Sequence, residues 1–370
     1  MAFLSVPYAI LPYLQETDHN DVDHDVEDNI TPAHRSIFIV QENMLFEWKN
    51  MFKGYEGAWC VGSSRGWLMI LDTEGCPFLL NPPSSTCIRL PTFSHAFMHR
   101  AGVTYSYFVQ HLLDSFVSKA VLMRSPSSSQ YTLAILFSYP CRLAFCTNSS
   151  TWVEPSGAKS FYCDIVFRDN ILYALAEDGS LEKWDFHKEV PRKILDFKLT
   201  MEWDEEEERE FPRDKFSSKI YLVMSEGELL LVKRLVGDFV NADGEVVYEG
   251  YKPRGYDGDV ICPYRTKHFM VYKLDYMKNK WVKKSTLHDR VLFLGANESA
   301  SVSAKEFKRC EANSIYFTDD RSEEMNLDYS YGGIDWGVFN LEDRCVKLLT
   351  PFANKMNPPP VWVVPTSDDF

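Results

Sequence analysis

The feature of this sequence that most limits its fold is a long succession of short apolar runs separated by turn residues. From Ser36 onward, runs rich in Val, Ile, Leu, Phe and Tyr recur about every 8–12 residues. The segment Asp164–Leu175 is typical, because an Asp169-Asn170 turn joins two apolar runs within it. Turns that contain Asp, Asn or Gly between alternating apolar runs are the strongest local indication of a β-hairpin. The pattern therefore predicts an all-β chain of consecutive antiparallel hairpins.

The hairpins carry a weak internal repeat, in which a strand ends in an acidic residue before a short gap. It recurs at Leu71-Asp72, Trp184-Asp185, Leu274-Asp275 and Leu341-Glu342. Trp184-Asp185 also matches the dipeptide that ends a blade strand in one class of propeller. Repetition in a strand-rich chain favours a closed ring, which limits exposed edge strands. With blades of about 40–50 residues, the 370 residues accommodate six or seven. We predict a β-propeller of antiparallel blades over residues 35–366.

Two segments depart from the strand pattern. Residues 1–34 begin with an apolar stretch and continue into an acidic one, and we expect them to form a short irregular N-terminal arm. The segment His111–Lys119 has helical spacing, with Leu112, Phe116 and Ala120 on one side. It is interpreted as a linker or short helix between blades.

The net charge of −14 makes nucleic acid and anionic membranes poor partners. Two acidic runs contribute to it, namely the seven carboxylates of Glu16–Asp28 and the five of Asp204–Glu208. Such runs are typical of solvated loops, and the alternative is an acidic docking segment for a basic partner. No apolar run reaches the ~18 residues that span a bilayer.

Several features indicate a cytoplasmic or nuclear protein. The first residues lack a basic region, and Pro7 and Pro12 interrupt their apolar stretch, so we expect no secretory signal. The nine cysteines are an odd number without a C-x-x-C pair, which is typical of reduced, mostly buried thiols. Asn148 and Asn297 match the glycosylation acceptor pattern, and we interpret both as chance matches.

One motif suggests a nucleophile. Gly62–Gly66 matches the G-x-S-x-G pattern, in which Ser64 would sit on a strained turn between a strand and a helix. Here Trp67–Leu71 follows the motif, and this segment has the pattern of a strand. A tight turn between two blade strands is therefore favoured over a serine hydrolase.

Histidines suggest two metal sites. His95 and His99 would lie on one face of a helix, but the motif lacks the glutamate of H-E-x-x-H and has no third ligand nearby. His19 and His24 lie among carboxylates in an acidic stretch that offers little preorganisation for a cation. The sequence also contains no P-loop, Rossmann, kinase or EF-hand motif. We therefore predict no catalytic, metal-binding or cofactor-binding residues and no enzymatic activity.

A resemblance to a known family adds to this interpretation. The segments that carry it are Val61–Asp72, Phe78–Pro82, Ile88–Pro91, Asp164–Phe167, Leu172–Ala174, Tyr221–Val232, Val271–Asp275, Trp281–Val282, Asp289–Gly295, Ser301–Ser303, Asn313–Asp320, Gly337–Leu341 and Pro358–Trp362. In order and spacing they resemble the plant KIB-type β-propeller family, which is also described as domain of unknown function 295. The resemblance covers about residues 36–365.

The resemblance implies a propeller that follows an N-terminal F-box. In such proteins the F-box docks on a Skp-type adaptor of a cullin ubiquitin ligase, and the propeller presents the ubiquitination substrate. Here Pro7–Pro12 resembles the segment that ordinarily follows the F-box, and no F-box pattern precedes it. We therefore expect a protein-binding module of the substrate-recognition kind, and without an F-box pattern these residues do not themselves predict docking on a Skp-type adaptor. The alternative is a scaffold or decoy propeller without an F-box and without a ligase role.

Overall fold

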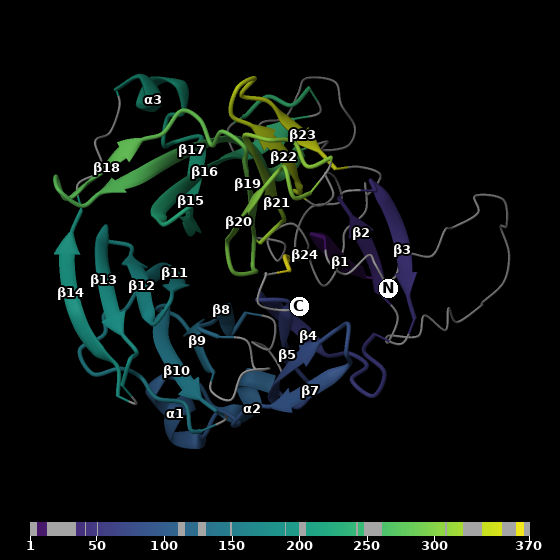
Figure 1. Cartoon of the computed structure of the whole chain (residues 1–370), viewed down its shortest axis with the longest axis vertical. Coiled ribbons are helices and arrows are strands. Elements are labelled where there is room, and N and C mark those ends of the chain that lie inside the picture. The colour runs from purple at the N-terminus through teal and green to yellow at the C-terminus, as the bar shows by residue number, and fades with distance from the viewer. Residues whose placement is uncertain are drawn as a thin grey trace, which may run out of the picture.

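In the part of the chain that the structure describes, the strands surround a common axis and form six sheets, which are the blades of a propeller (Figure 1). The computed structural model describes residues 6–12, 35–40, 42–49, 51–109, 115–124, 131–148, 150–188, 190–199, 205–241, 243–247, 261–307, 309–320, 335–349 and 360–365. The described residues form six blades, which confirms the propeller and agrees with the lower of the two expected blade numbers. The acidic run Glu16–Asp28, with His19 and His24, lies outside the described residues.

The first three blades occupy the N-terminal half of the ring. Blade 1 contains β24 (Val361–Val363), β1 (Tyr8–Pro12), β2 (Arg35–Ile39) and β3 (Met44–Trp48), in that order across the sheet. Blade 2 contains β4 (Trp59–Ser64), β5 (Trp67–Leu71), β6 (Pro77–Asn81) and β7 (Thr86–Arg89). Blade 3 contains β8 (Val117–Leu122), β9 (Thr132–Phe137) and β10 (Arg142–Thr147), and Val153 extends it by one bridge to Phe145.

The other three blades complete the ring. Blade 4 contains β11 (Tyr162–Arg168), β12 (Ile171–Ala176), β13 (Ser180–Asp185) and β14 (Arg192–Lys198). Blade 5 contains β15 (Phe216–Ser225), β16 (Glu228–Asn241), β17 (Ile261–Asp275) and β18 (Lys280–Lys283). Blade 6 has the order β20 (Ala300–Ser303), β19 (Arg290–Leu294), β21 (Ser314–Phe317), β22 (Gly337–Asn340) and β23 (Val346–Leu348).

The ring is closed by strands from the two ends of the sequence. β24 pairs antiparallel with β1, with Tyr8 opposite Val363, and β1 also pairs with β2. The prediction of irregular structure for residues 1–34 is therefore wrong at residues 8–12. Tyr8 and Leu11 are each 1% exposed, so this apolar segment is buried as a central strand. Its pairing partner lies at the far end of the sequence, where no local pattern reveals it.

Blade 6 departs from the expected antiparallel order. β19 turns inward into β20, and the chain then returns to place β21 parallel to β19, with Leu292 opposite Ile315. The other pairs in this sheet are antiparallel. The β19–β20 hairpin adds a fifth strand, β20, on one side of β19. The chain then continues with β21 on the opposite side of β19.

The local turns agree with the sequence pattern. Arg65 and Gly66 have φ values of 49° and 71°, as a two-residue hairpin turn between β4 and β5 requires. Asp169 has a φ of 53° at the predicted turn between β11 and β12. Tight hairpins of this kind are local in sequence, which is why their positions could be predicted.

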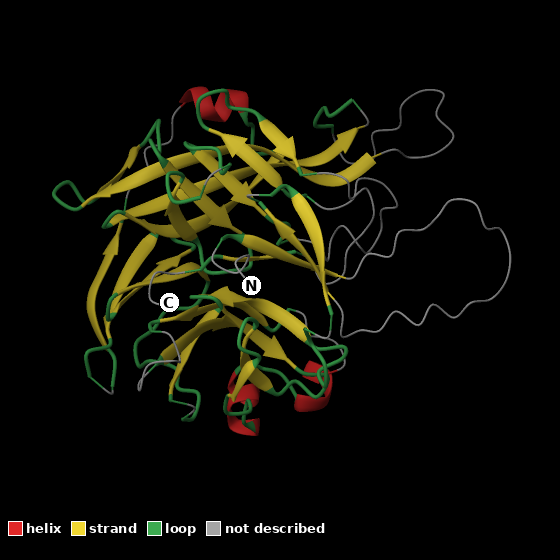
Figure 2. Cartoon of the chain, turned by 45° about the vertical axis from the view of Figure 1, so that its right-hand side comes forward, coloured by secondary structure: helices red, strands yellow, loops and turns green. Residues whose placement is uncertain are grey.

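Three short helices lie in connections between blades in the described residues (Figure 2). α1 (His95–Arg100) and α2 (Tyr105–Tyr107) connect β7 to β8, and their N-caps are Ser94 and Thr104. The predicted helical segment His111–Lys119 is wrong at its end, because Val117–Lys119 already belongs to strand β8 and residues 110–114 lie outside the description. None of the described helices is long and apolar enough to cross a membrane.

The third helix shows that the prediction of a solvated loop at the second acidic run is wrong. α3 (Glu205–Glu210) lies in the connection from β14 to β15, where the charge pattern of Asp204–Glu208 predicts a solvated loop. Glu is a good helix former, and the tertiary contacts of Glu207 described below hold this turn in place. Asp204 lies outside the described residues.

Candidate functional site

Ser64 does not form a nucleophile elbow. It is the last residue of strand β4, and the turn at Arg65-Gly66 leads directly into strand β5. Its hydroxyl donates to the carboxylate of Glu298 and accepts the backbone N–H of Leu122 at 2.8 Å. Because Leu122 belongs to blade 3 and Glu298 precedes β20 of blade 6, Ser64 connects three blades.

A buried ion pair continues this polar network along the inner strands. Lys119 Nζ lies 3.1 Å from Asp164 Oδ1 and 3.4 Å from Ser299 Oγ. The other carboxylate oxygen of Asp164 accepts the N–H of Leu222 at 2.7 Å. Blades 3, 4, 5 and 6 are thereby linked near the axis. Burial also raises the pKa of the nearby Glu298 carboxyl.

A second buried cluster fixes blade 6 to blade 5. Arg234 of β16 is 2% exposed, and its guanidinium lies 3.0 Å from Asp335 Oδ2 and 3.3 Å from Asp320 Oδ1. Burial alone would lower the pKa of Arg234, but Tyr221 and the neighbouring carboxylates raise it above its ordinary value. Burial would likewise raise the pKa of Asp320, yet Lys219 and Arg234 hold it below its usual range. This cluster is part of the framework of the ring.

The predicted histidine pair lies on the surface. His95 and His99 are both exposed on α1. No group of three or more His, Cys, Asp or Glu side chains that could hold a metal ion occurs within the described residues. The metal-ligand hypothesis for this pair therefore receives no geometric support.

The cysteines and the glycosylation motifs fit the expectations for them only in part, because five of the nine cysteines are partly or fully exposed and Asn148 is exposed. All nine cysteines are free, and Cys60, Cys146, Cys262 and Cys310 are buried. Burial raises the pKa of Cys146 to about 12, so this thiol is unreactive near neutral pH. The side chain of Asn297 is fully buried, which makes this acceptor motif inaccessible to glycosylation.

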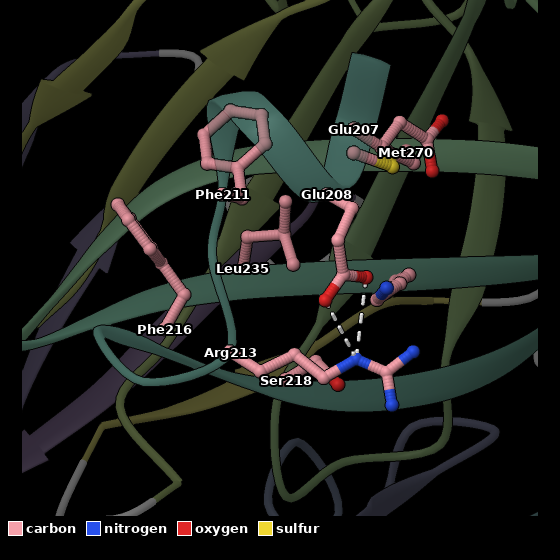
Figure 3. A pocket seen from close by; sticks show the side chains of 9 residues that line it. Glu207, Glu208, Phe211, Arg213, Phe216, Ser218, Leu235 and Met270 are labelled. Carbon is pink, nitrogen blue, oxygen red and sulfur yellow. Dashed lines mark hydrogen bonds and ion pairs between the residues drawn. The ribbon is translucent and has the colours of Figure 1, made fainter. Parts of the chain in front are cut away.

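Two cavities flank α3 and form what we call the α3 cleft. One, of about 240 Å³, is lined by Glu207, Glu208, Phe211, Arg213, Phe216, Ser218, Lys233, Leu235 and Met270 (Figure 3). The other, of about 270 Å³, is lined by Glu207, Glu210, His268, Phe269, Met270, Val271, Lys283, Lys284, Ser285, Phe339, Leu341 and Arg344. The two cavities share Glu207 and Met270, so α3 lies between two adjoining cavities, the first over blade 5 and the second between blades 5 and 6.

The carboxylates of α3 bind to both walls of this cleft. Glu207 is 8% exposed, and it accepts hydrogen bonds from Tyr272 Oη at 3.1 Å and Lys283 Nζ at 2.8 Å. Glu210 reaches blade 6, where Arg344 Nη2 lies 3.2 Å from its Oε2. The third pair, Glu208 with Arg213 at 3.1 Å, stays within the segment itself. Glu207 and Glu210 therefore tie α3 to the two blades.

An aromatic stack continues the attachment past the end of the helix. The Phe211 ring stacks on His268, with centroids 5.3 Å apart and an interplanar angle of 12°. His268 in turn meets the Phe339 ring edge to face at 5.0 Å. Burial, with Arg344 nearby, lowers the pKa of His268 to about 4, so the imidazole is neutral at pH 7. A neutral ring is suited to this apolar environment.

The floor of the cleft combines apolar side chains with cations. Leu235, Met270 and Phe339 supply apolar surface, while Lys233, Lys283, Lys284 and Arg344 supply positive charge. Lys233 is 6% exposed, and burial lowers its pKa. Buried and partly buried cations beside apolar surface are typical of sites that bind a charged group together with an apolar one.

A second exposed feature lies between blades 3 and 4. Tyr139 is 86% exposed and Phe161 45% exposed, and their rings meet edge to face at 6.2 Å. Phe161 has a φ of 63°, a conformation that bulky residues rarely adopt. Exposed aromatic residues are enriched at protein interfaces, and this pair lies in two connections between strands of the propeller.

Sequence reasoning missed the α3 cleft, because its cations come from segments far apart in the chain. One local signal was present. Glu207 and Phe211 are four residues apart and therefore share a helical face, which distinguishes the segment from a uniformly solvated acidic run.

Comparison with known proteins places the chain among plant F-box-associated propellers. The sequence is 35% identical over 100 residues to F-box protein At2g17690 of Arabidopsis thaliana, a match that covers 25% of this chain and 24% of that protein. Longer matches are to probable F-box protein At4g22060, 21% identical over 83% of this chain and 75% of that protein, and to putative F-box protein At5g55150, 23% identical over 89% and 80%, both of Arabidopsis thaliana.

The family profile of the KIB1-4 beta-propeller matches residues 40–340, which is most of the chain. This range contains all of blades 2 to 5 and the residues of the α3 cleft other than Leu341 and Arg344. The resemblance inferred from the motifs is thereby confirmed, and the protein belongs to the KIB1-4 β-propeller family.

Proposed function

We propose that this protein is a protein-binding module of the substrate-recognition kind, and that the α3 cleft is its principal docking surface. The observation that carries the proposal is the cleft itself. It joins apolar floor residues such as Met270 and Phe339 to cations such as Lys283 and Arg344. Interfaces gain most of their binding energy from such clustered anchors with a polar rim.

The relation to F-box proteins supports a role in ubiquitin-dependent turnover. Several relatives carry the name F-box protein, and the family propeller forms most of this chain. In this proposal the propeller binds a substrate and a ligase acts on it. We also propose a cytoplasmic or nuclear location, which imaging of a fluorescent-protein fusion tests.

The experiment is a comparative affinity purification from plant cells treated with a proteasome inhibitor. The bait is the full chain, compared with Lys283→Glu/Arg344→Glu in the cleft and with Lys278→Glu/Lys305→Glu on other exposed surfaces. The proposal predicts specific proteins that the cleft variant loses and the control variant keeps. Equal recovery by both variants would refute the cleft as the docking surface.

The same purification separates the two forms of the function. Recovery of a Skp-type adaptor with the wild-type chain supports a ligase subunit. Recovery of cleft-dependent partners without an adaptor instead supports the alternative, a scaffold or decoy propeller. The absence of any specific protein partner would overturn both.

A further inference from the structure

The α3 cleft has a charge distribution that indicates what it binds. We propose that it is the docking groove for an acidic segment of a partner protein, and that α3 occupies this groove as an internal substitute. The inference rests on the proposed protein-binding function and adds the chemistry of the partner to it. The glutamates of α3, the cations of the cleft and its aromatic residues each support an acidic partner segment.

The first step concerns the origin of the charges. Every carboxylate that lines either cavity comes from α3, namely Glu207, Glu208 and Glu210. Arg213 follows α3 in the same connection, and the other cations come from separate elements, with Lys233 on β16, Lys283 and Lys284 at the end of β18, and Arg344 between β22 and β23. Without α3 the lining would be apolar and positively charged. Glu228, which lines neither cavity, would remain paired with Lys284 at 3.4 Å. Such a lining is complementary to an acidic peptide.

The second step concerns how firmly α3 is attached. Glu210 and Arg344 are 52% and 55% exposed in their pair, whereas the Glu207–Lys283 pair joins a buried carboxylate to a side chain that is 56% exposed. The Glu210–Arg344 pair contributes little to stability, because water and salt compete with it, so the attachment of α3 depends mainly on Glu207 and Phe211. α3 itself has six residues, too few for a stable helix without tertiary contacts. A partner segment with the same groups can therefore compete with α3 for the floor.

The third step defines the groups that such a segment needs. Glu207 and Glu210 are three residues apart and face Lys283 and Arg344, respectively. Phe211 follows directly and stacks on the neutral ring of His268. The expected occupant is therefore an acidic helical turn with two carboxylates three residues apart and an aromatic residue after the second.

The test uses a peptide with the sequence of residues 204–211, Asp-Glu-Glu-Glu-Glu-Arg-Glu-Phe, acetylated and labelled with a fluorophore. Its control peptide carries Gln in place of the glutamates at positions 207, 208 and 210. The receptor is the full chain, either wild type or Glu207→Gln/Glu210→Gln, which weakens the internal occupant and leaves the floor unchanged. Fluorescence anisotropy measures the affinity, and circular dichroism confirms that each variant is folded.

We expect the Glu207→Gln/Glu210→Gln chain to bind the acidic peptide roughly tenfold more tightly than wild type, because competition by α3 is reduced. Adding Lys283→Ala/Arg344→Ala should abolish the gain, whereas adding Lys278→Ala/Lys305→Ala should not. High salt should weaken the binding, and the Gln peptide should bind poorly. If the double Gln variant does not fold, Glu210→Gln alone, at an exposed position, tests the same expectation with a smaller gain.

Equal binding of the acidic and Gln peptides, or a folded Gln variant that gains no affinity, would overturn the inference. Such a result leaves the proposed function standing if cleft-dependent partners are still recovered in the purification. Loss of those partners as well would overturn both. The two failures are therefore distinguishable.

Discussion

Replacement of Arg234 by methionine should be one of the most destabilising single changes in the ring. Arg234 is 2% exposed and lies 3.0 Å from Asp335 Oδ2 and 3.3 Å from Asp320 Oδ1. Methionine keeps the apolar part of the side chain but removes the cation. Breaking a buried pair in this way costs about 3–5 kcal/mol of unfolding free energy. Lys219 still lies 2.8 Å from Asp320, so Asp335 is the carboxylate that loses its cationic partner. We therefore expect a decrease in unfolding free energy in the lower half of that range.

Urea denaturation followed by tryptophan fluorescence measures this loss. The matched control is Lys273→Met, which removes a cation from the exposed pair with Glu228 on the neighbouring strand, where less than about 1 kcal/mol is expected. Addition of Asp335→Asn to Arg234→Met should recover part of the stability, since the uncompensated charge is then gone. The reasoning is wrong if Arg234→Met costs no more than Lys273→Met.

Three further changes test other parts of the structure. Ser64→Ala removes the hydroxyl that connects Leu122 and Glu298, so it should lower the unfolding free energy measured in urea titrations by about 1–3 kcal/mol. Any background ester hydrolysis by the protein should stay unchanged. A loss of hydrolysis would instead indicate a catalytic serine. Trp362→Ala empties a fully buried site on the closing strand β24 and should cost about 3–5 kcal/mol, and a near-neutral effect would contradict the closure. Burial lowers the pKa of His268 from its ordinary 6.5 to about 4 in the folded protein, so the neutral ring contributes fully to the unfolding free energy above pH 6.5 and this contribution is lost as the pH falls toward 4. His268→Phe should therefore reduce the acid-induced fall in melting temperature. An unchanged pH profile of the melting temperature would contradict this.

Features that depend on neighbouring residues could be predicted from the sequence. The turn at Arg65-Gly66 and the turn at Asp169 each join two apolar runs that pair with one another, so the local pattern specifies the hairpin. The same reasoning argued against a nucleophile elbow at Ser64, because Trp67–Leu71 is a short continuous apolar run that is typical of a buried strand. The family resemblance rested on a series of such local motifs.

Features that depend on distant pairing could not be predicted. β1 is central only because β24, from the opposite end of the chain, pairs with it. The parallel pair of β19 and β21 arises from the inward hairpin of β20, which no turn motif reveals. The α3 cleft is of the same kind, since Lys233, Lys283 and Arg344 converge on it from three separate elements. An acidic run by itself predicts a solvated segment, because the cations that surround it in the structure lie far from it in the sequence.

The central claim, that the α3 cleft binds an acidic segment of a partner, is tested most directly by site-specific photo-crosslinking in plant cells. A photoreactive residue replaces Lys284 at the cleft, and a matched one replaces Met277, which is 93% exposed in the β17–β18 turn. The account predicts a protein adduct at position 284 that the acidic peptide of residues 204–211 competes away and the Gln peptide does not. The same adduct at both positions, or one that resists the acidic peptide, would contradict it.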